Sequence, residues 1–192
     1  MIVRICFVGD SITNGTGDPE YLGWVGRVMQ HEHVRRAELT AYNLGIRRDR
    51  SDQVRLRWRA EVEARLPAEH EGRIVFAFGA NDAVQEIAPA VTLGHAEAIL
   101  TDARKRWPVI LVGPAPLGDD KARERVAGLD EAMAALCRRL GLSYVTVFEG
   151  LMATPVWLDE ARRGDGAHPG AGGYRRLAEI ILANEAWRAW MP

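Results

Sequence analysis

Two stretches of the sequence are apolar at nearly every position. Ile74-Val75-Phe76-Ala77-Phe78 contains no polar residue, and the segment from Ile2 to Val8 is interrupted only by Arg4. A strand with one face in water alternates apolar and polar residues, so continuous apolar runs indicate strands that are buried on both faces. We therefore expect a mostly parallel sheet with helices covering both of its faces.

Strand-like and helical segments alternate along the rest of the chain. Further strands are predicted at Leu39–Leu44, Val109–Val112 and Tyr144–Phe148. Helices are predicted at about residues 19–33, 51–66, 92–107, 120–140 and 174–181, and residues 149–170 are expected to form a long loop. Asp18 and Pro19 have the residue types of an N-cap and a first helical position. The alternation predicts a single domain over residues 1–192, a three-layer α/β/α sandwich with five strands.

The charge balance and the apolar pattern argue against several classes of protein. The 25 lysines and arginines nearly balance the 26 aspartates and glutamates, so no net field attracts nucleic acid or an anionic membrane. No apolar run reaches the length of a membrane span, and residues 1–4 belong to a strand rather than to a signal peptide. Cys6 and Cys137 are expected to be buried free thiols, which are typical of a reducing compartment. We therefore expect a cytoplasmic protein, whose oligomeric state the sequence leaves open.

Polar residues and glycines follow four of the five predicted strands. Ser11 comes after the first strand, Gly45 after the second and Asn81 after the third, and Asp165 with His168 lies beyond the fifth. Because the carboxyl ends of parallel strands meet at one edge of a sheet, we expect these residues to lie together. Ligands bind at that edge in open α/β sheets, so it is the candidate functional site.

These residue types supply the groups that acyl transfer requires. Ser11 would attack a carbonyl carbon, and His168 would accept its proton and return it to the leaving group. Asp165 would hold the other nitrogen of the ring. The backbone N–H groups of Ser11 and Gly45 and the side-chain amide of Asn81 would stabilise the oxyanion. A glycine at position 45 would also let the backbone approach the substrate closely, since a Cβ atom would intrude there.

Four short motifs resemble, in the same order, the four blocks of the SGNH (GDSL-type) esterases and lipases. They are Gly9-Asp10-Ser11-Ile12, Asn43-x-Gly45, Gly79-x-Asn81-Asp82 and Asp165-x-x-His168-Pro169. The resemblance extends from Ile5 to about Leu182. It implies a flavodoxin-like sheet with strand order 2-1-3-4-5. It also implies hydrolysis of small-molecule esters or thioesters, with neither a metal nor a cofactor. The Gly-x-Ser-x-Gly motif of the α/β-hydrolases is absent from the sequence.

Three arginines follow Gly45 and allow two interpretations. Arg48 occupies a position where the family often has a second glycine, so it is a candidate for the rim of the substrate site. Arg47 and Arg50 lie beside it and, like Arg48, could bind a carboxylate or phosphate of the substrate. Alternatively, all three are solvated charges of a loop.

Other residues near the motifs are expected to have supporting roles. Asp10 and Asp82 are predicted to hydrogen-bond the backbone of their turns. Trp157 lies in an apolar segment that could line an acyl pocket at the substrate rim or pack on the core. Arg57 is expected on a solvated helix face, where it can pair with Glu61 four residues later.

The predicted turns after the strands are short, apart from residues 149–170, so we expect no inserted lid. A shallow site binds little of a long acyl chain, which favours esters of short acyl groups.

Two other functions remain open. A metal-dependent phosphoesterase is suggested by Gly9-Asp10 and the turn at residues 79–82, but such a site needs several histidines and only His168 is suitably placed. A non-catalytic binding module could share the fold, although no group needed for catalysis is missing.

Overall fold

In the computed structural model, which describes residues 2–35 and 38–191, five parallel strands form one sheet. The strand order is β2-β1-β3-β4-β5, and each neighbouring pair is parallel. The strands are β1 (Val3–Gly9), β2 (Leu39–Gly45), β3 (Glu71–Ala77), β4 (Val109–Val112) and β5 (Ser143–Val145). The predicted fold class and strand order are therefore confirmed.

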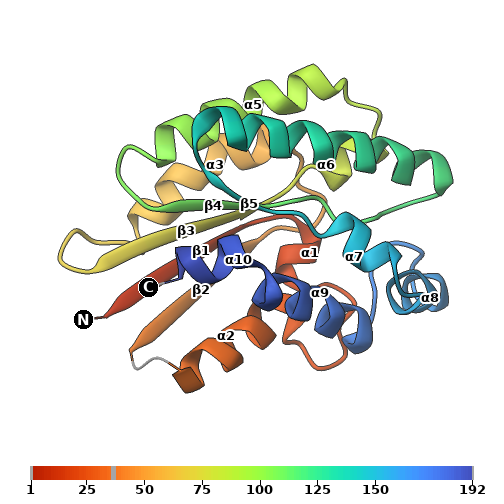
Figure 1. The fold of residues 1–192 in the computed structure, drawn as a ribbon, viewed down its shortest axis with the longest axis horizontal. Coiled ribbons are helices and arrows are strands. Elements are labelled where there is room, and N and C mark those ends of the chain that lie inside the picture. Colours follow the sequence, from red (N-terminus) through yellow and green to blue (C-terminus); the bar gives the residue numbers. More distant parts are fainter. Residues whose placement is uncertain (1, 36–37, 192) are drawn as a thin grey trace.

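Helices cover both faces of the sheet (Figure 1). On one face lie α2 (Gly23–Arg35), α9 (Ala171–Ala183) and α10 (Glu185–Trp190), and on the other lie α3 (Ser51–Glu63), α5 (Pro89–Ala103) and α6 (Asp120–Leu140). Four shorter helices lie beyond the carboxyl ends of the strands. They are α1 (Ser11–Asn14), α4 (Ala80–Val84), α7 (Phe148–Met152) and α8 (Val156–Arg163).

Alternating side chains of the strands build an apolar core on each face of the sheet. On one face Phe7 meets Trp24 of α2 edge to face, with ring centroids 5.5 Å apart. On the other face Phe76 meets Trp58 of α3 with centroids 5.6 Å apart. Complete burial of one large apolar side chain contributes about 1.5–3 kcal/mol, so these contacts attach both helix layers firmly to the sheet. The carboxyl ends of the strands are thereby held in a fixed arrangement.

The segment predicted as a long loop contains α7 and α8 instead. Accordingly β5 ends at Val145 rather than at Phe148, which begins α7. Helix α8 forms because Trp157 and Ala161, four residues apart, are both buried on one side of it. This side packs on the core. The apolar residues of the segment did not by themselves distinguish a packed helix from a loop.

Helix α2 begins at Gly23 rather than at Pro19. Tyr21 and Gly23 both have a φ of 55°, in the left-handed region that interrupts a helix. The carboxylate of Asp18 accepts hydrogen bonds from the N–H groups of Glu20 and Gly23 at 3.1 and 2.8 Å. Asp18 therefore caps the helix from five residues away rather than from its predicted position.

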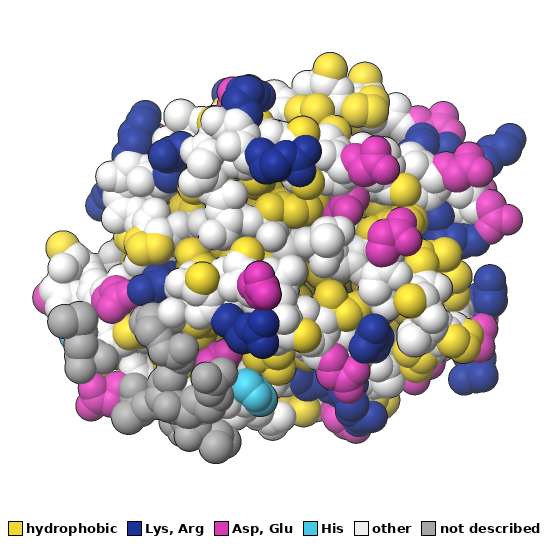
Figure 2. Space-filling model, viewed as in Figure 1, with side chains coloured by type: hydrophobic (Ala, Val, Ile, Leu, Met, Phe, Trp, Pro, Cys, Tyr) yellow, Lys and Arg dark blue, Asp and Glu magenta, His cyan; other side chains and the backbone are white. Residues whose placement is uncertain are grey.

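Cys6 and Cys137 are both buried and free, as predicted. Burial disfavours the thiolate and raises the pKa of each thiol to about 12, so neither is a nucleophile at neutral pH. Within the described residues, no helix has both the length and the apolar character that a membrane span requires. Figure 2 shows acidic and basic side chains interspersed over one face, in keeping with a net charge near zero.

Candidate active site

Ser11, His168 and Asp165 form one hydrogen-bonded series. Oγ of Ser11 lies 2.8 Å from Nε2 of His168, and Nδ1 of the same ring lies 2.7 Å from Oδ2 of Asp165. Ser11 begins α1 directly after β1, whereas His168 lies between α8 and α9. The tertiary fold thus joins a hydroxyl and an imidazole that are 157 positions apart in the sequence.

The carboxylate of Asp165 determines which ring nitrogen carries the proton. An ionised carboxylate only accepts hydrogen bonds, so Nδ1 of His168 must be protonated and must donate to it. In the neutral ring, Nε2 then accepts the hydroxyl proton of Ser11. Oδ1 of Asp165 also accepts the backbone N–H groups of Ala167 and His168, at 3.0 and 2.9 Å, which holds the carboxylate in place beside the ring.

The carboxyl group of Asp165 is strongly biased toward its ionised form. Its partial burial raises the pKa, but hydrogen bonds from the His168 ring and from the backbone of His168 and Ala167 outweigh burial and lower the pKa to about 2. The side chain is 43% exposed, and Nη2 of Arg47 lies 3.1 Å from it. An exposed ion pair of this kind contributes about 1 kcal/mol or less. Asp165 therefore remains a hydrogen-bond acceptor throughout the pH range in which a histidine titrates.

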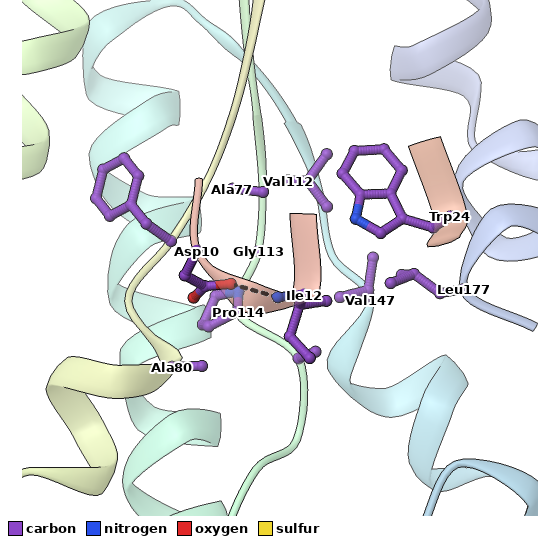
Figure 3. Close-up of a pocket in the computed structure, with 12 residues that line it drawn as sticks. Asp10, Ile12, Trp24, Ala77, Ala80, Val112, Gly113, Pro114, Val147 and Leu177 are labelled. Atoms are coloured by element: carbon purple, nitrogen blue, oxygen red, sulfur yellow. Dashed lines mark hydrogen bonds between the residues drawn. The ribbon is translucent and has the colours of Figure 1, made fainter. Parts of the chain in front are cut away.

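Asp10 caps the helix that carries the candidate nucleophile. Its backbone is extended, and its Oδ1 accepts the N–H of Ile12 at 2.9 Å (Figure 3). Asp82 likewise hydrogen-bonds to backbone, since it accepts the N–H of Ser51 at 2.9 Å. Asp10 thus makes the predicted contact with its own turn, whereas Asp82 bonds the first residue of α3, 31 positions away, instead of the backbone of its own turn.

A cavity of about 20 Å³ lies next to Asp10. This volume is on the order of that needed by one water molecule. Its walls are mainly apolar and include Ile12, Trp24, Val112 and Leu177 (Figure 3). Of the described residues that line it, Asp10 alone has an ionisable side chain. Burial in these surroundings raises the pKa of Asp10 to about 7.

Asn81 lies on α4, in the turn that follows β3. Its Nδ2 donates to the backbone oxygen of Asp49 at 2.9 Å, which uses one of the two amide hydrogens. That the other amide hydrogen binds an oxyanion stays a prediction. The neighbouring Asp82 connects this turn to α3 through Ser51, and it also accepts a hydrogen bond from the hydroxyl group of Thr92 at 3.2 Å. Asp49 therefore holds the amide itself, and Asp82 holds the turn that carries it.

The N–H of Gly45 already has an acceptor within the protein. It donates to Oδ1 of Asn43 at 3.0 Å, so an oxyanion would have to displace this side chain, and the oxyanion role of Gly45 stays a prediction. The glycine is required for another reason. A Cβ atom would lie 2.2 Å from the backbone nitrogen of Asn14 and 2.7 Å from the backbone oxygen of Asp10. The close approach at this position is therefore to the turn that carries Ser11.

The three arginines after Gly45 have different surroundings. Arg47 pairs with Asp165, and Arg50 pairs with Asp52 at 3.0 Å. Arg48 is exposed, and its φ of 72° lies in the left-handed region that favours glycine. A role for Arg48 at the substrate rim stays a prediction.

Trp157 does not reach the substrate rim. Its side chain is completely buried, and its Nε1–H donates to the backbone oxygen of Pro116 at 2.8 Å. The ring also packs edge to face on Tyr174, with centroids 6.0 Å apart. The candidate rim role is therefore wrong, and the alternative of packing on the core is correct.

A surface cleft of about 580 Å³ runs along His168 and Asp165. Gly17 forms part of its wall with a φ of 90°, and a Cβ atom there would lie 2.9 Å from Cβ of His168. The hydroxyl group of Tyr174 donates to the backbone oxygen of Thr16 at 2.7 Å and holds this loop against α9. The sequence motifs did not reveal these supports, because a glycine and a tyrosine serve many other purposes.

Among residues 2–35 and 38–191, no group of three or more histidine, cysteine, aspartate or glutamate side chains could hold a metal ion. That the protein needs no cofactor stays a prediction.

A comparison with models of protein families found a match over most of the chain. Residues 7–176 match the model of the GDSL-like lipase/acylhydrolase family, a stretch that contains all four motifs. None of the curated proteins matches the sequence.

Solved structures with the same fold include a lipase/acylhydrolase from Enterococcus faecalis, which is 23% identical, with 98% of this chain and 97% of that chain covered and a TM-score of 0.79. A member of the lipolytic G-D-S-L family from Veillonella parvula is 19% identical, with 95% and 97% covered and a TM-score of 0.75. An acetylxylan esterase from Geobacillus stearothermophilus is 17% identical, with 95% of each chain covered and a TM-score of 0.76.

Proposed function

The chain belongs to the GDSL-like lipase/acylhydrolase family, and from that premise we propose that it hydrolyses carboxylic esters or thioesters through Ser11, His168 and Asp165. The observation that carries the proposal is the continuous series of hydrogen bonds from Oγ of Ser11 through the His168 ring to Asp165. This series contains a nucleophile, a base and a group that orients the base, which is the arrangement that acyl transfer requires.

In the proposed reaction, Oγ of Ser11 attacks the carbonyl carbon while Nε2 of His168 takes the hydroxyl proton. The carbon–oxygen or carbon–sulfur bond to the leaving group then breaks, and the imidazolium returns the proton to the departing alcohol or thiol. Water attacks the resulting acyl-enzyme with the same ring as base, which releases the acid and restores Ser11. Asp165 stabilises the imidazolium in both steps.

Two donors are available for the oxyanion of the tetrahedral intermediate. They are the backbone N–H of Ser11, at the beginning of α1, and the second amide hydrogen of Asn81. The N–H of Gly45 would join them only by leaving Oδ1 of Asn43. Loss of one oxyanion donor costs about 10²–10³-fold in kcat, so Asn81→Ala should lower kcat by at least about 10²-fold.

Catalytic mutants of the acetylxylan esterase support these assignments. One of these variants replaces a serine by alanine, a second replaces an aspartate and a third replaces a histidine. The residue types are those proposed for this chain. By analogy with that enzyme, acetyl esters are substrates to test first.

We also propose that the enzyme prefers short acyl groups, from acetyl to hexanoyl. The cleft along His168 lies at the surface, and Trp157 is buried in the core instead of lining a deeper acyl pocket. Each methylene buried in a deeper pocket would contribute about 0.8 kcal/mol, or about fourfold in kcat/KM. A series of 4-nitrophenyl esters from acetyl to dodecanoyl should therefore show no rise beyond hexanoyl, and a steady rise to dodecanoyl would contradict the shallow site.

The experiment that tests the mechanism compares the wild type with Ser11→Ala in hydrolysis of 4-nitrophenyl acetate. Loss of the nucleophile should lower kcat by at least about 10³-fold in a folded protein. Ser143→Ala, at the opposite end of the sheet, is the matched control and should keep its activity. Labelling of the wild type with a serine-directed fluorophosphonate, and its absence in Ser11→Ala, distinguishes an enzyme from a binding module. Wild-type turnover in purified Ser11→Ala would show that the proposed mechanism is wrong.

A further inference from the structure

Arg57 is not the solvated residue that its position on α3 predicts. Only 15% of its side chain is exposed. The predicted pair with Glu61 is present at 3.0 Å, but the guanidinium also reaches three acceptors that the sequence pattern does not indicate. They are Oδ2 of Asp49 at 2.6 Å, the backbone oxygen of Leu44 at 2.9 Å and the backbone oxygen of Gly9 at 2.9 Å.

Two of these contacts join the carboxyl ends of β1 and β2. Gly9 is the last residue of β1 and stands two positions before Ser11, while Leu44 is the next-to-last residue of β2. The backbone oxygen of Gly9 also accepts the N–H of Ile46 at 3.0 Å, so the strand end is held by a backbone donor and by the guanidinium together. Arg57 therefore holds Gly9, the residue from which the turn that carries Ser11 begins.

The contact with Asp49 also links Arg57 to Asn81, the second of the two proposed oxyanion donors. Asp49 is buried, and its carboxylate accepts Nε of Arg57 while its backbone oxygen accepts Nδ2 of Asn81 at 2.9 Å. A single residue thus connects the guanidinium to the amide. Movement of Arg57 would move Asn81 relative to Ser11.

We infer that Arg57 is a positioning residue that sets the distance between the two oxyanion donors, the N–H of Ser11 and the amide of Asn81. The inference rests on the proposed function. Arg57 contacts neither of these residues directly and acts through Gly9 and Asp49. A guanidinium presents its donors in a rigid planar fork, so it can hold acceptors in fixed relative places, whereas a lysine offers one flexible ammonium group.

Arg57→Lys tests this role, because it keeps the charge that pairs with Asp49 and removes the fork. A misplacement of about 1 Å at a reacting centre can cost about 10²-fold. We expect kcat for 4-nitrophenyl acetate to fall by about 10- to 100-fold with KM changed by less than about threefold, because the donors act mainly on the transition state. Arg59→Lys is the matched control. It lies on the same helix, is half exposed and pairs with Glu63 at 3.3 Å, and should leave kcat unchanged.

A double-mutant cycle with Asn81→Ala separates positioning from general destabilisation. If Arg57 acts through the amide of Asn81, then most of the effect of Arg57→Lys disappears once that amide is gone. The combined variant should therefore be within about threefold of Asn81→Ala alone. Losses that multiply would show that Arg57 does not act through Asn81 and would overturn the inference, and a lower Tm with unchanged kcat would show that Arg57 has only a structural role.

A measurement that does not depend on turnover keeps the two proposals distinguishable. The side-chain amide signals of Asn81, observed by NMR, should exchange with water at least about fivefold faster in Arg57→Lys than in the wild type or in Arg59→Lys. Equal exchange in all three proteins would overturn the inference. A wild type that hydrolyses no ester would contradict the proposed function, while the exchange rates would still decide whether Arg57 positions Asn81.

Discussion

Replacement of Asp10 by asparagine should keep the N-cap of α1 and remove a buried ionisable group, so the two roles of the side chain can be measured separately. Asparagine and aspartate are about equally good N-caps, and the amide oxygen can still accept the N–H of Ile12. The two side chains are also nearly equal in size. What the substitution removes is a carboxyl group that is 3% exposed, lies against an apolar cavity and has Asp49 and Asp82 as charged neighbours of the same sign.

The pKa of Asp10 determines the sign and size of the effect. Burial, assisted by the charges of Asp82 and Asp49, raises the pKa from its ordinary 3.8 to about 7 against the hydrogen bonds from the backbone. Between about pH 4 and pH 7 the folded protein keeps this proton and the unfolded chain does not. The free energy of unfolding contributed by Asp10 therefore falls as the pH rises through this window, and it is constant above it. At about 1.4 kcal/mol for each pKa unit, the unfolding free energy of the wild type at pH 8 is lower by about 4 kcal/mol than it is below both pKa values.

Urea unfolding of the wild type and Asp10→Asn at pH 4.5, 6 and 8 measures this effect. The loss that Asp10 causes in the wild type is only about 1 kcal/mol at pH 4.5 and grows to about 4 kcal/mol at pH 8, so the variant should gain stability relative to the wild type as the pH rises. Asp159→Asn removes a carboxylate that is 41% exposed, and it serves as a control that should show no such trend. A difference in unfolding free energy that is the same at all three pH values would refute the raised pKa and the reasoning from burial.

Three further predictions concern the site and its surroundings. Asp165→Asn should lower kcat by about 10²–10⁴-fold at pH 8, because the ring loses the partner that selects its tautomer, and an unchanged kcat would rule out this role. Arg48→Gly should raise the free energy of unfolding in urea by about 1 kcal/mol, because glycine adopts a φ of 72° without strain. It should also weaken any preference for anionic over neutral acetyl esters, and an unchanged ratio of rates would show that Arg48 is merely solvated. Trp157→Phe should cost about 1–3 kcal/mol by leaving the buried oxygen of Pro116 without its donor, while the acyl-length profile stays the same. A changed profile would return Trp157 to the substrate site.

Local patterns were sufficient to predict the strands and the edge of the sheet at which the site forms. The apolar run through Phe76 required burial on both faces, and this requirement alone selects a sheet with helices on both sides. Turn residues directly after strands have little freedom in where they can lie. For this reason the positions of Ser11 and Asn81 could be predicted from strand ends that were correct to within one or two residues.

Helix and loop boundaries after β5 were harder to predict, because they depend on packing. The stretch that contains Trp157 and Ala161 has too few residues for a clear helical period, and it became a helix through contact with the core. The start of α2 was displaced by the left-handed backbone at Tyr21, which its residue type does not favour.

By itself, then, the sequence determined the α/β class, the alternation of the strands with the long helices and the chemical groups that meet at the carboxyl edge of the sheet, because all of these follow from periodicity and strand ends. Only the tertiary structure decided which groups are free to act. The N–H of Gly45 is taken by a side chain two residues away, and Arg57 holds the end of β1 across 48 positions of sequence. A hydrogen-bond donor can be used only once at full strength, and its partner is chosen by distance in space.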